Sequence, residues 1–329
     1  MPPDTEPTPP PAPDNDPLPE YLSEVWLDLD WSPWVPFDAS REFFYIPKEP
    51  GVYRIRPAGE NFLMYIGETG QSLHKKLAEF RQALRRADLM PWSDPHEAAP
   101  CLWAYWVEWA QKRSRETLKE PIPESDDEVG LPKPVMFEFS AAPLDASPAG
   151  RRGMAFFLLY RYRQDHGESP VCNFGRFHPR YRRSSTRREA RRGAKLEEDQ
   201  KDNPAGFLSV PPLAVEGTCG SSDWMGLEWS KKQALTKENV LAVATGAGLY
   251  LLSDAVSGEI LFIGQSADLR KRLHEEIMKH RDGCELVFSY QVVGESVFPH
   301  NLRELECDLI GNFFEQNRKA PDLRFRNTR

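Results

Sequence analysis

The feature that most constrains this chain is an internal repeat. Residues 248–273 contain two short apolar runs, GLYLL and ILFIG, separated by the turn-forming segment SDAVSG and followed by a helical pattern. Residues 51–77 have the same order, with PAGEN as the turn-forming segment and YIG closing the second run. Apolar runs bounded by glycine, serine and aspartate predict two strands joined by a turn. The chain is therefore expected to contain two copies of one strand–turn–strand–helix unit.

The repeat extends upstream of the strands. The two stretches start 197 residues apart, and LDWSPW at Leu29–Trp34 matches LEWSKK at Leu227–Lys232, about twenty residues before each Gly-Xaa-Tyr. Two unrelated hairpin-and-helix units are the simpler alternative, because such units are common. Matched spacing at two places favours a duplication instead.

These residues resemble the GIY-YIG nuclease family: a Gly-Xaa-Tyr, about ten residues, a Tyr/Phe-Ile-Gly, and a helix with a basic residue near its start. The resemblance occurs twice and covers most of residues 25–190 and 225–329. It implies an α/β (α+β) fold of two tandem small modules, each a short, mainly antiparallel sheet flanked by helices. It also implies divalent-metal-dependent hydrolysis of DNA phosphodiester bonds, with RNA left open as the substrate.

The domain boundaries follow from shifts in composition. The first 19 residues hold nine prolines and four acids, which is typical of a disordered tail and not of a secretory signal. The predicted units are a tail at 1–20, a first module at 21–195, a linker at 196–224 and a second module at 225–329. The first module contains an insertion at 87–134 that has no counterpart in the second, and a basic extension at 176–195.

Further elements follow from apolar periodicity. CLWAYWVEW at 101–109 predicts a buried strand, and VMFEFSAAPL at 135–144 predicts another. Helices are expected at 73–86, 153–164, 268–281 and 302–316, and a last strand at 286–293.

Composition narrows the setting of the protein. No run approaches the roughly eighteen apolar residues of a membrane span. The five cysteines form no Cys-Xaa-Xaa-Cys pair, which disfavours zinc fingers and suits a reducing cytoplasm. A net charge of −8 argues against a non-specific nucleic-acid coat protein.

The basic extension is the exception to the acidic balance. It carries nine Lys or Arg against one Glu, which favours contact with phosphates. A solvated linker neutralised by the acidic LEEDQKD at 196–202 is the equal alternative. The candidate nucleic-acid-binding residues are Arg176, Arg180, Arg182, Arg183, Arg187 and Arg188, with Asn173 added because it matches the family pattern.

In the second module the resemblance implies that Tyr250 helps to activate the attacking water and that Arg272 faces the phosphate. Phe262 stands where the family has its second tyrosine, so one hydroxyl is missing. Arg272 lies at the edge of the apolar stripe of its helix, whereas Lys271 points away from that stripe. A surface arginine in a basic cluster is the alternative for Arg272.

Glu306 is the candidate metal ligand. It lies in the middle of the apolar face formed by Leu302, Leu309, Ile310 and Phe313, whereas Glu304 and Asp308 point the other way. A carboxylate in an apolar stripe is costly unless it is paired or bound to a metal. The resemblance implies one Mg²⁺ or Mn²⁺ here, and a structural ion pair is the alternative.

The first module departs from the family pattern at other positions than the second. Tyr53 and Tyr65 are both present, but Lys76 replaces the arginine and cannot grip phosphate with two prongs. Ala155 stands where the second module has Glu306.

Two hypotheses remain open on the sequence. In the first, the second module is a DNA endonuclease and the first module binds or orients the substrate. In the second, both modules are inactive and the chain is a nucleic-acid-binding or assembly protein, motivated by Ala155, Lys76 and Phe262 together. A tandem repeat can supply within one chain the pairing of a homodimer, so a monomer is expected.

Overall fold

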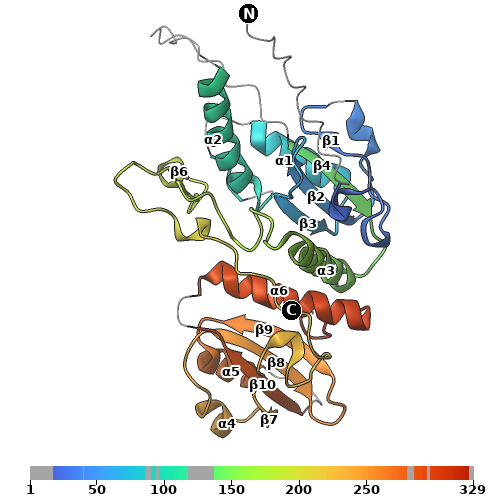
Figure 1. Cartoon of the computed structure of the whole chain (residues 1–329), viewed down its shortest axis with the longest axis vertical. Coiled ribbons are helices and arrows are strands. Elements are labelled where there is room, and N and C mark those ends of the chain that lie inside the picture. The colour runs from blue at the N-terminus through green and yellow to red at the C-terminus, as the bar shows by residue number, and fades with distance from the viewer. Residues whose placement is uncertain are drawn as a thin grey trace, which may run out of the picture.

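The computed structural model describes residues 18–39, 41–85, 90–93, 96–117, 137–279, 285–294 and 297–325. Within them, two four-stranded sheets lie at opposite ends of the molecule, separated by the long helices α3 (Pro148–His166) and α6 (Pro299–Asn317), as Figure 1 shows. The predicted mixed α/β fold with antiparallel sheets is confirmed. The expected tail, apart from its last residues, and residues 118–136 of the insertion lie outside the described residues.

The two sheets have the same topology, with all neighbouring strands antiparallel. The first has the order β1-β4-β2-β3, and the second the order β7-β10-β8-β9. The bounds in the first are β1 Val35–Pro36, β2 Gly51–Pro57, β3 Tyr65–Thr69 and β4 Phe137–Pro143. Those in the second are β7 Gln233–Ala234, β8 Gly248–Asp254, β9 Ile260–Ser266 and β10 Leu286–Val292.

The repeated sequence motifs occupy equivalent places. Tyr53 pairs with Gly67 across β2 and β3, and Tyr250 pairs with Gly264 across β8 and β9. A Cβ on either glycine would lie 2.6–2.7 Å from atoms of two aromatic rings. The glycine of each Tyr/Phe-Ile-Gly is therefore required because two rings cover its Cα.

The upstream repeat folds into the same hydrogen-bonded turn, here called the clasp, in both modules. In 26–32 the indole N–H of the second tryptophan donates to the carbonyl of the first at 3.1 Å, and in 224–230 the same bond is 3.0 Å. The serine hydroxyl that follows accepts from a strand N–H, that of Ala141 in β4 and that of Tyr290 in β10. Each clasp thus fixes the chain that leads into its sheet.

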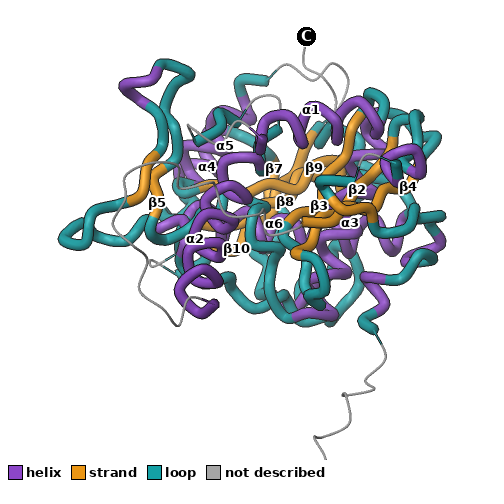
Figure 2. The backbone as a smooth tube through the Cα atoms, turned by 90° about the horizontal axis from the view of Figure 1, so that it is seen from above, coloured by secondary structure: helices purple, strands orange, loops and turns teal. Residues whose placement is uncertain are grey.

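The remaining helices cover the outer faces of the sheets. In the first module α1 (Leu73–Arg85) and α2 (Ala99–Thr117) pack on one face and α3 on the other. In the second, α4 (Lys237–Leu241) and α5 (Leu269–Ile277) pack on one face and α6 on the other. The basic extension contributes a two-stranded ribbon, β5 (Tyr181–Arg182) with β6 (Ala194–Lys195), which projects from the side of the molecule (Figures 1 and 2).

One predicted element is wrong. Residues 101–109 lie within helix α2 and do not form a strand. The nine-residue aromatic run is too short for periodicity to separate a strand from a buried helix. The helix continues to Thr117.

Helix α6 is buried on all sides over most of its length, because it lies between its own sheet and α3 (Figure 1). Glu304 and Asp308 point away from the apolar face, as expected, but the opposite face on which they lie packs against α3, so both side chains are fully buried. Asp308 accepts from Arg163 of α3 through both oxygens, at 2.7 and 3.0 Å. Glu304 accepts from Ser209 and from the N–H of Val210, so the linker is tied to the same junction.

Among the described residues, no helix is long and apolar enough to cross a membrane.

Candidate functional site

A cavity of about 740 Å³ opens in the second module at the start of α5. It is lined by all four residues that the sequence singles out in this module, Tyr250, Phe262, Arg272 and Glu306. They come from β8, β9, α5 and α6 respectively, so four elements of the fold converge here. The cations Lys271, Arg303 and Arg324 also line the cavity, as do Asp268 and Glu275, so the lining holds four cations and three acids.

Tyr250 is the centre of a hydrogen-bonded network on the α5 side. Its hydroxyl donates to Glu276 at 3.0 Å and accepts from Nε of Arg272 at 2.9 Å. Burial, reinforced by the negative charge of Glu276, raises the pKa of Tyr250 well above its usual value. Tyr250 is therefore a neutral phenol at physiological pH, able to orient a water but not to act as a free phenolate.

Arg272 is held in place by two acids of its own helix. Its guanidinium contacts Glu276 at 2.9 Å and Glu275 at 3.2 Å, and the side chain is about a third exposed, at 31%. An arginine has five N–H donors. Three of them have the partners just named, which leaves donors for an anion in the cavity.

Glu306 faces the same cavity from α6. Its carboxylate lies 2.9 Å from Arg324 and also accepts from the N–H of Gln265. Burial raises the pKa of Glu306, and the charge of Arg324 only partly offsets this effect. The prediction that α6 places a carboxylate at the site is supported by its position in the lining, and its partner Arg324 was not foreseen.

Glu306 is the candidate ligand of this lining for a divalent cation of the hard, oxygen-binding type. Among the described residues no group of three or more His, Cys, Asp or Glu could hold a metal. Magnesium, however, is commonly bound through one or two carboxylates together with waters and substrate phosphates. Glu306 would supply that one carboxylate, and a bound cation would compete with Arg324 for it.

Phe262 lies where the first module has Tyr65. Its ring stacks on Tyr250, with centroids 5.7 Å apart, and Arg324 lies over it at 5.4 Å. It keeps the aromatic packing of the site without adding a hydroxyl.

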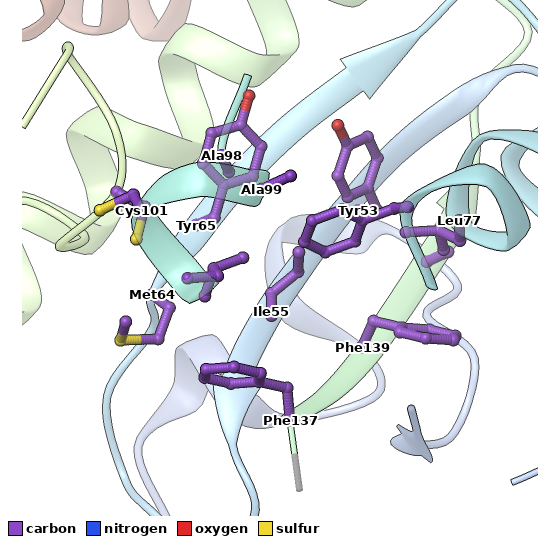
Figure 3. Packing of buried hydrophobic residues seen from close by; sticks show 14 of the residues in the cluster. Tyr53, Ile55, Met64, Tyr65, Leu77, Ala98, Ala99, Cys101, Phe137 and Phe139 are labelled. Atoms are coloured by element: carbon purple, nitrogen blue, oxygen red, sulfur yellow. The ribbon is translucent and has the colours of Figure 1, made fainter. Parts of the chain in front are cut away.

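The equivalent place in the first module is filled by the chain itself. The hydroxyl of Tyr53 is bonded to Nε2 of His96 at 2.8 Å, and Tyr65 donates to Glu97. The backbone there continues into Ala98 and Ala99, which lie fully buried beside both tyrosines (Figure 3). The segment that leads into α2 thus covers the hydroxyls of the two tyrosines that correspond to Tyr250 and Phe262.

His96 is neutral in this plug. Its Nδ1 accepts from the N–H of Ala98 at 3.1 Å, so the proton resides on Nε2 and is donated to Tyr53. Burial, followed by the charge of Lys76, lowers its pKa well below the usual value. With Ala155 buried at the position of Glu306, the described residues provide no carboxylate on α3 at this point.

Removing the hydroxyl of Tyr53 is expected to affect folding and not catalysis. In Tyr53→Phe the buried Nε2–H of His96 loses its acceptor, which costs about 1 kcal/mol of unfolding free energy. Any cleavage of DNA in the cavity of the second module should be unchanged, because Tyr53 does not line that cavity. Denaturant unfolding and a nicking assay measure the two effects, with Tyr45→Phe as a half-exposed control. Reduced cleavage by a fully folded variant would contradict the plug.

The nucleic-acid-binding candidates divide into two groups. Asn173 and Arg176 are buried: the amide of Asn173 bonds to both the N–H and the carbonyl of Ile66, and Arg176 donates to the Ser169 carbonyl. Arg180 holds the ribbon through Asp202 and three carbonyls. The residues that lie exposed on the projecting ribbon are Arg182, Arg183, Arg187 and Arg188.

Sequence reasoning missed Glu276, Arg303 and Arg324 as parts of the site. Glu276 had a usable signal, because it lies one helical turn after Arg272 and so on the same face. Arg324 follows α6 in a segment without periodicity, so no sequence pattern indicates its contact with Glu306.

Comparisons with protein-family models, with curated proteins and with solved structures find no match to this chain.

Proposed function

We propose that this protein is a divalent-metal-dependent endonuclease that hydrolyses DNA phosphodiester bonds in the cavity of the second module. The observation that carries the proposal is the convergence of Tyr250, Arg272 and Glu306, from β8, α5 and α6, on one cavity. Phosphodiester hydrolysis needs an oriented water, positive charge at the phosphate and stabilisation of the leaving oxygen. These three side chains match those needs.

The roles follow from the contacts. The oxygen of a water bonds to phosphorus while one P–O ester bond breaks. Tyr250 orients that water, and a proton that the water loses passes to Tyr250 as the hydroxyl proton of Tyr250 passes to Glu276. Arg272 binds the non-bridging oxygens through its remaining donors. The ion held by Glu306 would supply positive charge to the phosphate and the leaving oxygen.

The first module then has a supporting role. Its own site is plugged, and it presents the ribbon with Arg182, Arg183, Arg187 and Arg188 for contact with phosphates. One chain would act as a monomer with an internal pair of modules, and one intact site would nick one strand at a time.

The test is conversion of supercoiled plasmid to the nicked form with Mg²⁺ or Mn²⁺. Arg272→Ala is expected to lower the rate by about 100-fold, and Arg272→Lys to recover it only in part, because lysine lacks the two-pronged grip. Arg270→Ala is the matched control: Arg270 lies on the same helix but donates to the Val243 carbonyl. An Arg272→Ala protein that nicks as fast as the parent would contradict the proposal.

A second candidate function has one observation in its favour. Arg272 is paired with Glu276, and Glu306 is paired with Arg324, so the candidate catalytic groups neutralise one another. The chain would then be a nucleic-acid-binding or assembly protein whose affinity comes from the ribbon. No nicking with either metal, together with salt-sensitive DNA binding that is lost when the four ribbon arginines are replaced, would favour this candidate.

A further inference from the structure

The cavity of the second module is completed by the first module. Phe156 of α3 and Phe174, which follows α3, both line it, together with Phe262, Arg303 and Arg324. The rings of Phe156 and Phe174 are half-buried, so they are available to the cavity. Neither residue has a role in the hydrolysis described above.

The backbone of Phe174 is held in an uncommon conformation by hydrogen bonds on both sides of it. Its φ of 58° lies in the left-handed region, which residues other than glycine rarely adopt. Before it, the amide of Asn173 is fixed to Ile66 of β3 by two hydrogen bonds, of 2.8 and 3.0 Å. Its own carbonyl accepts from Arg303 of α6 at 2.9 Å. The ring is thus positioned by contacts to both modules.

The lining combines two chemistries. Three phenylalanine rings provide apolar, flat surfaces, and the four cations Lys271, Arg272, Arg303 and Arg324 outnumber the three acids of the lining, which are Asp268, Glu275 and Glu306. Single-stranded nucleic acid is typically bound by such a combination, with bases stacked on aromatic rings and the backbone held by cations. In a continuous duplex the bases are stacked on one another, so aromatic rings would have no base face to contact.

We propose that the cavity accepts an unpaired nucleotide, with its base against Phe174 and Phe156 and its phosphate at Arg272. The preferred substrate is accordingly single-stranded or locally unpaired DNA. This inference rests on the proposed function in one respect, because the bound phosphate is the one to be cleaved. The volume of about 740 Å³ lies within the range of pockets that enclose small ligands.

The test measures binding apart from cleavage. Fluorescence anisotropy of a short labelled oligonucleotide is recorded with EDTA present, once as a single strand and once annealed to its complement. We expect the single strand to bind about tenfold more tightly than the duplex. Phe174→Leu should lose most of that preference, whereas Phe174→Tyr, which keeps the ring, should retain it. Phe44→Leu is the control, since Phe44 is an exposed ring of the first module outside the cavity lining.

Equal affinity for the two forms, or an unchanged preference in Phe174→Leu, would overturn the inference. The failure of the proposed function is a separate result. A preference that depends on Phe174 without any nicking would keep the nucleotide pocket and remove the nuclease. Nicking of duplex DNA without such a preference would keep the nuclease and remove the nucleotide pocket.

Discussion

Replacing Glu306 with glutamine is expected to lower plasmid nicking by about 100- to 1,000-fold while leaving the protein folded. The amide preserves the shape of the side chain and can still contact Arg324, but it loses the charge that holds a divalent cation. Initial rates at saturating Mg²⁺ or Mn²⁺, compared with the parent, measure the effect. Glu315→Gln is the matched control, because Glu315 lies on the same helix and pairs with Arg161 outside the cavity lining.

The same variant separates function from stability. Burial raises the pKa of Glu306, so the folded protein binds the proton more tightly than the unfolded chain does. Ionisation of Glu306 therefore lowers the free energy of unfolding. This loss is absent at a pH below the pKa of Glu306 in the unfolded chain, and it is complete at a pH above the raised pKa of Glu306 in the folded protein. Glu306→Gln should keep or raise the melting temperature at neutral pH.

Nicking by the parent should increase as the pH rises through the raised pKa of Glu306, since only the carboxylate binds the cation. A variant that nicks normally would exclude Glu306 as the metal ligand.

Replacing Asp308 with alanine is expected to lower the unfolding free energy by about 3–5 kcal/mol, the largest effect on stability. The change leaves the guanidinium of Arg163 buried at 0% exposure without its carboxylate at the junction of α3 and α6. The double variant Arg163→Met with Asp308→Leu should recover only part of the loss, because no buried guanidinium is left without Asp308 but the fully buried Glu304 loses its contact with Arg163 and keeps only its hydrogen bonds to Ser209, Val210 and Asn301.

Denaturant titration measures this effect, with Glu315→Ala as the control. The pair of Glu315 with Arg161 lies at the same helix junction but is about one-third exposed, so its loss should cost about 0–1 kcal/mol. If Asp308→Ala costs no more than Glu315→Ala, the buried pair does not hold the modules together.

The repeat was enough to predict the hairpin of each sheet, because its glycines and aromatic residues are required by contacts within that hairpin, whereas the two-residue edge strands β1 and β7 were not predicted. Glu306 could be placed for a related reason: its position depends on the periodicity of one helix. Glu304 and Asp308 were assigned correctly to the opposite face, yet their burial was not foreseen. The periodicity of one helix does not reveal which element packs on its polar face. For α6 that element is α3, about 145 residues earlier in the chain.

The plug of the first module could not be predicted for a different reason. His96 lies outside any periodic segment, and its contact with Tyr53 depends on where α2 begins. The assignment of residues 101–109 to a strand concealed that helix, although Tyr53 and Tyr65 were correctly identified as counterparts of the second-module pair. The site of the first module thus looked more complete in sequence than it is in the fold.

The contribution of Phe156 and Phe174 to the other module's cavity has a consequence for dissecting the protein. A fragment that spans only 225–329 would contain Tyr250, Arg272 and Glu306 but would expose the α6 surface that α3 covers and would lack one part of its cavity. The two modules therefore form one structural unit, in which the module with the plugged site supplies part of the cavity lining of the other.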